Sequence, residues 1–229
     1  MINSVAILRM RSAIMKLTTR DIKKMSRQKT AVIGLAFFLA LCIAAIICPL
    51  LSPYKATEMT VNFLQGPTRS NWFGTDDLGR DIFTRTVYGI RTSLLVGMGT
   101  ALGSSVLGMF FGLLAGFSNK ADSYIMRVMD VIMAFPPILL ALAILAVFGR
   151  KASNILMVLS IVYTPRIARI VRSATLSARE EVFVEAARGI GARQWHILLR
   201  HVLPNIFSPF IIQATFVFAY GILSEAGLG

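Results

Sequence analysis

The chain has 229 residues, of which 55% are hydrophobic and only 15% charged, and its formal net charge is +13. Soluble domains usually carry about 25% charged residues, so this composition excludes an ordinary soluble domain and favours a polytopic membrane protein. An excess of Lys and Arg on such a protein reports topology, and no basic-aromatic module indicates a nucleic-acid partner.

The amino-terminal segment, residues 1–29, contains eight Lys or Arg and one acidic residue, Asp21. The uncharged run Thr30–Leu51 follows it and would span about 33 Å as a helix, enough to cross the hydrocarbon core. The long basic leader and the absence of a small-residue cleavage site favour an uncleaved first span over a secretory signal. Cys42 and Cys48 lie six residues apart in this run, so they predict neither a mutual disulfide nor a metal site.

Residues 52–92 mix acidic, basic, Gly and Pro residues, and predict an outside loop that re-enters as a helix near Asp81. We expect Asp76 or Asp77 to cap that helix; an anion or metal site there is the disfavoured alternative. The second predicted span is Ser93–Phe117. It carries glycines at small-xxx-small spacings, which predict close packing against another helix; these are Gly99, Gly103, Gly108, Gly112 and Gly116.

The third predicted span, Val128–Phe148, is interrupted by Pro136 and Pro137, which are expected to kink it. Asp130 lies near one end of this span, where a carboxylate reaches water. An interfacial anchor is the favoured interpretation of Asp130, and a role in gating or in the pathway is the alternative. Asp130, Pro136 and Pro137 are therefore the candidate gating or pathway residues.

The fourth and fifth predicted spans are 154–171 and 206–224, separated by a basic loop over 172–205. Pro165–Pro204 holds seven arginines, and four crossings put them on the same side as the basic amino terminus. The positive-inside rule then predicts that the amino terminus and the loop 172–205 are cytoplasmic.

No motif of a common enzyme class is present. The sequence lacks a P-loop, H-E-x-x-H, C-x-x-C and G-x-S-x-G. His196 and His201 are five residues apart, which is not a metal-binding spacing on one helical face. We therefore predict no enzymatic activity, no catalytic residue, and no cofactor or metal site in this chain.

The most polar stretch within the apolar part of the chain is Glu180–Asn205, which divides into two amphipathic halves. Gly189 and Gly191 are expected to separate the halves, and Pro204 to stop the second helix. Helical spacing predicts one apolar stripe in each half: Phe183, Ala186, Ala187 and Ile190, then Trp195, Leu198, Leu199 and Val202. A docking element is the favoured interpretation, with Glu185 and Arg188 paired on one face; a helix lying on the lipid surface is the alternative.

Glu185-Ala186-Ala187, then Gly191, then Leu203-Pro204 resembles the EAA loop of permease subunits of bacterial ABC importers. The resemblance implies that the loop inserts into a groove of a partner ATPase. It assigns the coupling role to Glu185, Ala186, Ala187, Arg188, Gly191, His201, Leu203 and Pro204. His201 replaces an apolar residue of the consensus, and His-x-Leu-Pro-Asn is typical of the peptide and nickel importer subgroup.

Two further stretches carry the resemblance. Asn71–Leu94 is similar to the segment before the second span of the C-type permease subunit of dipeptide/oligopeptide importers, through Phe73-Gly74-Thr75-Asp76 and Gly79-Arg80-Asp81. Asp130 with Ala134-Phe135-Pro136 is a weaker match.

The resemblance implies an all-α membrane bundle, with five spans of an expected six within residues 30–229, in a bacterial inner membrane. Its expected partners are a homologous permease subunit, two cytoplasmic ATPases that bind ATP and Mg²⁺, an extracytoplasmic solute-binding protein and membrane lipid. Because the chain ends soon after the fifth span, we expect the sixth to be missing. The expected function is ATP-driven uptake of di- or oligopeptides by alternating access. The alternatives are a nickel or other small-solute importer, a truncated remnant that transports nothing, and a secondary transporter that needs no ATPase.

Overall fold

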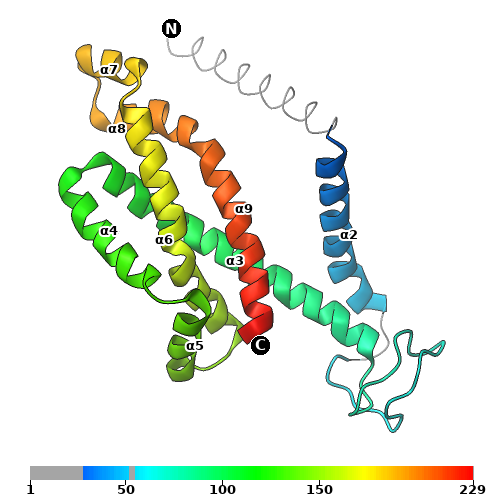
Figure 1. Ribbon diagram of the computed structural model, residues 1–229. Helices are drawn as coiled ribbons and strands as arrows, with labels where there is room; N and C mark the ends of the chain where they lie inside the picture. The colour runs from blue at the N-terminus through cyan, green and yellow to red at the C-terminus, as the bar shows by residue number, and fades with distance from the viewer. Residues whose placement is uncertain (1–27, 52–54, 229) are drawn as a thin grey trace. The chain divides into compact units, whose positions relative to one another are not determined.

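The computed structural model describes residues 28–51 and 55–228 (Figure 1), and the predicted amino-terminal segment before residue 28 lies outside this range. The described residues form helices joined by loops, with one isolated β-bridge between Thr75 and Asp81. The chain divides into two compact units, Met1–Arg91 and Thr92–Gly229. The all-α fold expected from the sequence is confirmed for the residues described.

The first unit contains α2 (Lys29–Leu51), which covers the predicted first span, and a folded loop that leads into α3 (Ile82–Phe117). The loop is held by backbone hydrogen bonds from Thr60 to Gly79 and between Gln65 and Thr75. Gly74 has φ +78°, and a Cβ at this position would collide with the carbonyl oxygen of Gln65. Only glycine fits this crossing of two loop segments.

Asp81, not Asp76 or Asp77, caps the start of α3. Its Oδ2 accepts hydrogen bonds from the backbone N–H of Thr84 at 2.8 Å and from the Thr84 hydroxyl at 2.6 Å. The Asn71 side chain donates to the other carboxylate oxygen, so the cap is buried and fully bonded. The predicted helix start near Asp81 is confirmed, whereas the predicted capping residue is wrong because Asp76 serves the turn before it.

The second unit is built around α6 (Ala152–Arg179), which packs along α9 (Leu203–Leu228). α4 (Asn119–Met133) and α5 (Pro137–Phe148) also pack against α6. Figure 1 shows the short helices α7 (Val182–Gly189) and α8 (Gln194–Ile197) at one end of α6, with the carboxyl end of α9 at the other.

Five glycines of α3 face α6, as their spacing predicts: Gly99, Gly103, Gly108, Gly112 and Gly116. A Cβ at Gly108 would lie 2.6 Å from Cβ of Ile167, and one at Gly112 would lie 2.6 Å from the carbonyl oxygen of Ala168. These distances are shorter than any van der Waals contact, so the helices approach as closely as they do only because the side chains are missing. α6 is consequently the most enclosed of the long helices.

The predicted third span is two helices instead of one kinked helix. α4 ends at Met133, α5 begins at Pro137, and the two are bent by 87°. Neither Pro136 nor Pro137 has an N–H to continue the hydrogen-bond ladder. Pro137 also forces Pro136 out of the helical region, to ψ 129°. Two adjacent prolines therefore break the helix, where one would kink it.

The last helix begins earlier than predicted. α8 continues through a π-helical turn, η1 (Leu198–Val202), into α9, so Pro204 lies within continuous helix and does not stop it. The N–H of Leu203 reaches the carbonyl of Leu198, five residues back. This wider turn makes room for the ring of Pro204, which clashes with an ordinary α-helical turn.

Three helical segments of the described chain are long and apolar enough to cross a membrane: Ile82–Phe117, Ala152–Arg179 and Gln194–Leu228. The bent pair of α4 and α5 makes a fourth if it is counted as one span, and α2 contains a shorter apolar stretch, Val32–Ile47.

Candidate functional site

The candidate site is the segment after α6, where α7 and α8 meet at a turn centred on Gly191. Gly191 has φ +79°, its N–H donates to the carbonyl of Arg188, and the N–H of Ala192 donates to the carbonyl of Ala187. These two bonds form a Schellman motif, which satisfies the last carbonyls of α7 and turns the chain sharply. The predicted separation of the two halves by glycine is confirmed, and the residue with the left-handed backbone is Gly191.

The buried face of α7 differs from the predicted apolar stripe. Val184 and Ala187 are buried, and both belong to the hydrophobic cluster that includes Ala178 of α6. Phe183, Ala186 and Ile190 of the predicted stripe are exposed, Ile190 by 86%. Periodicity located an apolar face of α7, but α7 is anchored through a face rotated by one residue.

The second half of the segment also buries a different face from the one predicted. Leu198 and Val202 are buried as expected, together with Ile197. Trp195 and Leu199 are exposed. The buried face is therefore centred on Ile197, Leu198 and Val202, while Trp195 lies beside the end of α3.

The predicted coupling residues divide into anchoring and outward-facing groups. Ala187 is buried, and His201 and Leu203 are half-buried. The His201 ring lies 6.1 Å from the rings of Phe183 and His196. Gly191 and four others are exposed: Glu185, Ala186, Arg188 and Pro204. Glu185 and Arg188 make no ion pair within the described part of the chain, so their predicted pairing is wrong.

We call the outward side of α7 the α7 surface, and define it as Val182, Phe183, Glu185, Ala186, Arg188 and Ile190. All six residues are exposed. The surface combines large apolar side chains with one acidic and one basic group. Such a mixture on a short, firmly anchored helix is typical of a protein-binding surface.

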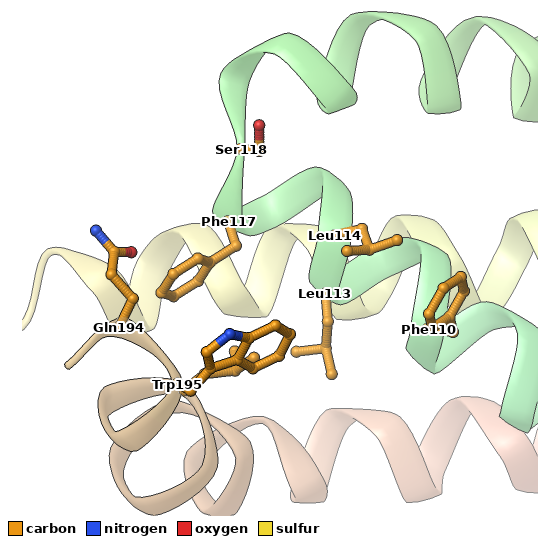
Figure 2. A pocket seen from close by; sticks show the side chains of 8 residues that line it. Phe110, Leu113, Leu114, Phe117, Ser118, Gln194 and Trp195 are labelled. Carbon is orange, nitrogen blue, oxygen red and sulfur yellow. The ribbon is translucent and has the colours of Figure 1, made fainter.

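An apolar pocket of about 350 Å³ lies beside the site, between the end of α3 and the start of α8. Figure 2 shows Leu113 and Phe117 pointing from α3 towards Trp195. Gln194 and Ser118 are the polar residues at its edge. The predicted docking element is therefore also connected to α3, through the side chain of Trp195.

Arginines of α6 tie it to α4 and α3 near this end. Arg169 donates to Asp130 at 2.7 Å, and Arg172 forms a two-point pair with Asp122. Arg179 donates to the carbonyl of Gly116 at 2.6 Å. Asp130 thus joins α4 to α6 about one turn before α4 ends at Met133. Sequence analysis missed these pairs, although the three-residue spacing of the α6 arginines is their signal.

The loop before α3 contains a second charged cluster, centred on Asp76. Desolvation of the Asp76 carboxyl raises its pKa, but hydrogen bonds from the backbone N–H of Arg80 and Leu78 and from the Arg80 and Arg85 side chains outweigh it. The net result is a pKa lowered to about 2. Asp76 therefore stays ionised and organises the turn that precedes the Asp81 cap.

Two family models match the sequence. Residues 104–228 match the binding-protein-dependent transport system inner membrane component, and residues 19–67 match the N-terminal TM domain of oligopeptide transport permease C.

Three relatives illustrate the likeness. The chain is 44% identical over 210 residues to the dipeptide transport system permease protein DppC of Alkalihalophilus pseudofirmus. The aligned region covers 90% of this chain and 69% of the relative. The chain is 38% identical over 214 residues to the di/tripeptide transport system permease protein DppC of Pseudomonas aeruginosa (89% and 70%). It is 37% identical over 209 residues to the glutathione transport system permease protein GsiD of Pectobacterium atrosepticum (90% and 69%).

Proposed function

Because the chain belongs to the family of binding-protein-dependent transport system inner membrane components, we propose that it is the C-type transmembrane subunit of a bacterial importer for di- or oligopeptides. It is a multi-pass membrane permease, and the chemical work is done elsewhere in the complex. Two cytoplasmic ATPases bind ATP and Mg²⁺, a homologous permease subunit completes the pathway, and an extracytoplasmic binding protein delivers the solute.

The observation that carries the coupling role is the α7 surface. Its apolar side chains are exposed although α7 itself is anchored by Val184 and Ala187. An eight-residue helix is marginally stable on its own, so α7 depends on the buried Val184 and Ala187 to hold it in place. A surface held in this way is suited to transmit force. We infer that a groove of a partner ATPase receives it, with Glu185 and Arg188 free for ion pairs across that interface.

Movement of α7 is expected to reach the membrane helices directly. α7 follows α6 after a short turn, and it packs against α6 and α8. α8 continues into α9 without a break in helical structure. Closure of the ATPases would therefore displace α6 and α9 together, because both are extensions of the same docking element.

The break between α4 and α5 is the candidate gating element. Asp130 and Arg169 join α4 to α6 on one side of it, while Pro136 and Pro137 interrupt the helical hydrogen bonds that would otherwise fix the angle between α4 and α5. In this mechanism α4 moves with α6, and the bend absorbs the difference between the inward-open and outward-open states.

Peptides are the proposed solutes because the relatives named for dipeptide, di/tripeptide and glutathione transport share most of this chain. Nickel or another small solute remains the alternative within the same class. The amino terminus is proposed to be cytoplasmic, in agreement with the positive-inside rule.

The coupling role is tested by Ile190→Asp in the complete complex, reconstituted in proteoliposomes with both ATPases, the second permease and the binding protein. Ile190 is 86% exposed, so the substitution removes little packing within the chain, whereas a carboxylate in an apolar groove weakens docking. We expect ATPase activity stimulated by loaded binding protein to fall roughly tenfold, the scale of one interface hot spot. The matched control is Val61→Asp, at a loop residue that is also 86% exposed.

Unchanged ATPase co-purification and unchanged stimulated hydrolysis in the Ile190 variant would contradict the coupling proposal. Peptide uptake that continues without either ATPase, driven by an ion gradient, would instead favour the secondary transporter.

A further inference from the structure

Four arginines of α6 lie near one another along the helix, and one differs from the others in its partners. Arg169 and Arg172 pair with carboxylates of α4, and Arg179 donates to a backbone carbonyl of α3. Arg166 has no carboxylate partner and no hydrogen-bond acceptor among the residues that the structure describes. Its guanidinium carbon instead lies 4.7 Å from the ring centroid of Tyr220 and 5.3 Å from that of Tyr163.

The two tyrosine rings form a fixed support for this guanidinium. They are stacked, with centroids 6.2 Å apart and an interplanar angle of 19°. The buried Tyr163 is held by a 2.7 Å hydrogen bond between its hydroxyl and that of Ser224. A guanidinium held by its contacts with ring faces keeps its N–H groups available at its edge. The Tyr220 hydroxyl also lacks a partner in the described part of the chain, so a second donor stands near the first.

Arg166 lies within a helix long enough to span a membrane, where a charged guanidinium without a polar partner is energetically unfavourable. It lies 14 residues after Ala152 and 13 before Arg179, the two ends of α6, which is about 20 Å from either end at 1.5 Å per residue. Tyr220 is 42% exposed, so the pair lies at an edge of the second unit. Arg166 lies one turn inside the Arg169–Asp130 pair, so its guanidinium and the Tyr220 phenol face protein or a water-filled pathway, because contact with lipid tails is strongly unfavourable.

We propose that Arg166 and the Tyr220 hydroxyl form an anion-binding site of the translocation pathway, which binds the carboxyl-terminal carboxylate of the transported peptide. The planar guanidinium matches a carboxylate with two parallel hydrogen bonds, and the phenol supplies a third. Every linear peptide carries this group whatever its side chains, so the site suits a transporter of many peptides. The inference rests on the proposed function, because it names a subsite for the solute of that same importer.

The experiment measures ATP-driven uptake of trialanine and of trialanine carboxamide by the complete reconstituted complex. The binding protein is the same throughout, so its own preference cancels when the acid-to-amide ratio is compared between permease variants. For Arg166→Gln we expect the KM for trialanine to rise roughly 10- to 100-fold, the effect of losing hydrogen bonds to a charged group. Uptake of the carboxamide should change less than about twofold.

Two further variants keep the test decisive. Arg166→Lys retains the charge but loses the planar guanidinium with its two parallel N–H donors, and should reduce the acid-to-amide ratio by an intermediate factor. Arg150→Gln removes the same charge from the exposed turn between α5 and α6, and should leave the ratio unchanged. If the Gln variant fails to assemble, the ratio measured for the Lys variant decides the question.

Equal loss of acid and amide uptake in the Arg166 variants would overturn the proposal, since it would mean that Arg166 only joins α6 to a neighbouring helix or subunit. An unchanged ratio would overturn it as well. A wild-type complex that transports neither peptide with ATP would contradict the proposed function itself, which is a different outcome from either of these.

Discussion

At the scale of single residues, polar side chains in this protein act by holding a backbone shape or another charge. Asp81 caps α3, Gly191 turns the chain after α7, and Asp76 gathers two backbone N–H groups and two arginines. Each role depends on a short local geometry that a change of one atom disrupts. Sequence patterns predicted the turn at Gly191 correctly, but they assigned the cap of α3 to Asp76 or Asp77 instead of Asp81.

The lowered pKa of Asp76 predicts an acid-sensitive loop. Its folded pKa is about 2 and its ordinary value is 3.8, so the ionised carboxylate stabilises the loop fully above pH 4, and that contribution is lost as the pH falls towards 2. Fluorescence of Trp72, which packs 4.9 Å from Phe83 next to this turn, reports the change in a Trp195→Phe background. Asp76→Asn should remove the transition between pH 4 and pH 2; a transition of unchanged midpoint would show that another group causes it.

At the scale of helices, the close packing of α3 against α6 depends on glycines of α3, which have no side chain. Five glycines face α6 and bring the two backbones together, which lets α6 bury more of its length than the other long helices. The break between α4 and α5 has a different origin, because two prolines create it, while Ala141 and Leu145 of α5 stay buried against the rest of the unit. The unit thus combines a tightly joined pair of helices with one sharp bend.

Gly112→Ala should separate α3 from α6. The added Cβ would lie 2.6 Å from the carbonyl oxygen of Ala168, which belongs to backbone and cannot turn aside. We expect a loss of about 1–3 kcal/mol in stability, the usual effect of overpacking. Thermal unfolding in detergent, followed by size-exclusion chromatography, measures the shift. Gly34→Ala is the matched control, since a Cβ there meets nothing within 4 Å; equal melting of both variants would contradict the close-packing argument.

At the scale of the whole molecule, α6 connects the two ends of the second unit. Its amino-terminal end adjoins the turn at Arg150, and its carboxyl-terminal end leads into α7. A helix of 28 residues is about 42 Å long, which exceeds the hydrocarbon core. The proposed topology therefore places α7 on one side of the membrane and the turn at Arg150 on the other.

This arrangement predicts the labelling of single cysteines introduced after Cys42 and Cys48 are replaced by Ser. Arg150→Cys should react with a membrane-impermeant maleimide in spheroplasts, because the proposed topology places this turn on the outer side. Ile190→Cys should react only after permeabilisation, because the same topology places the α7 surface in the cytoplasm. The opposite pattern would reverse the proposed topology and remove the coupling role from α7.

The sequence by itself determined features that depend on neighbours along the chain. Uncharged runs located the long helices, small-residue spacing predicted the close face of α3, and Glu185-Ala186-Ala187 with Gly191 indicated the segment for which a docking role is proposed. These patterns are readable because helix length, glycine conformations and charge near a membrane act over a few residues.

The tertiary structure alone decided which face each helix buries and which charges find partners. Val184, not Phe183, anchors α7, because α6 and α8 meet it on that side. Asp130 pairs with Arg169 across 39 residues, while Arg166, three residues away from Arg169, is left to two tyrosines. Periodicity gives the relative angle of residues on one helix, but the neighbour that selects a face comes from a distant part of the chain.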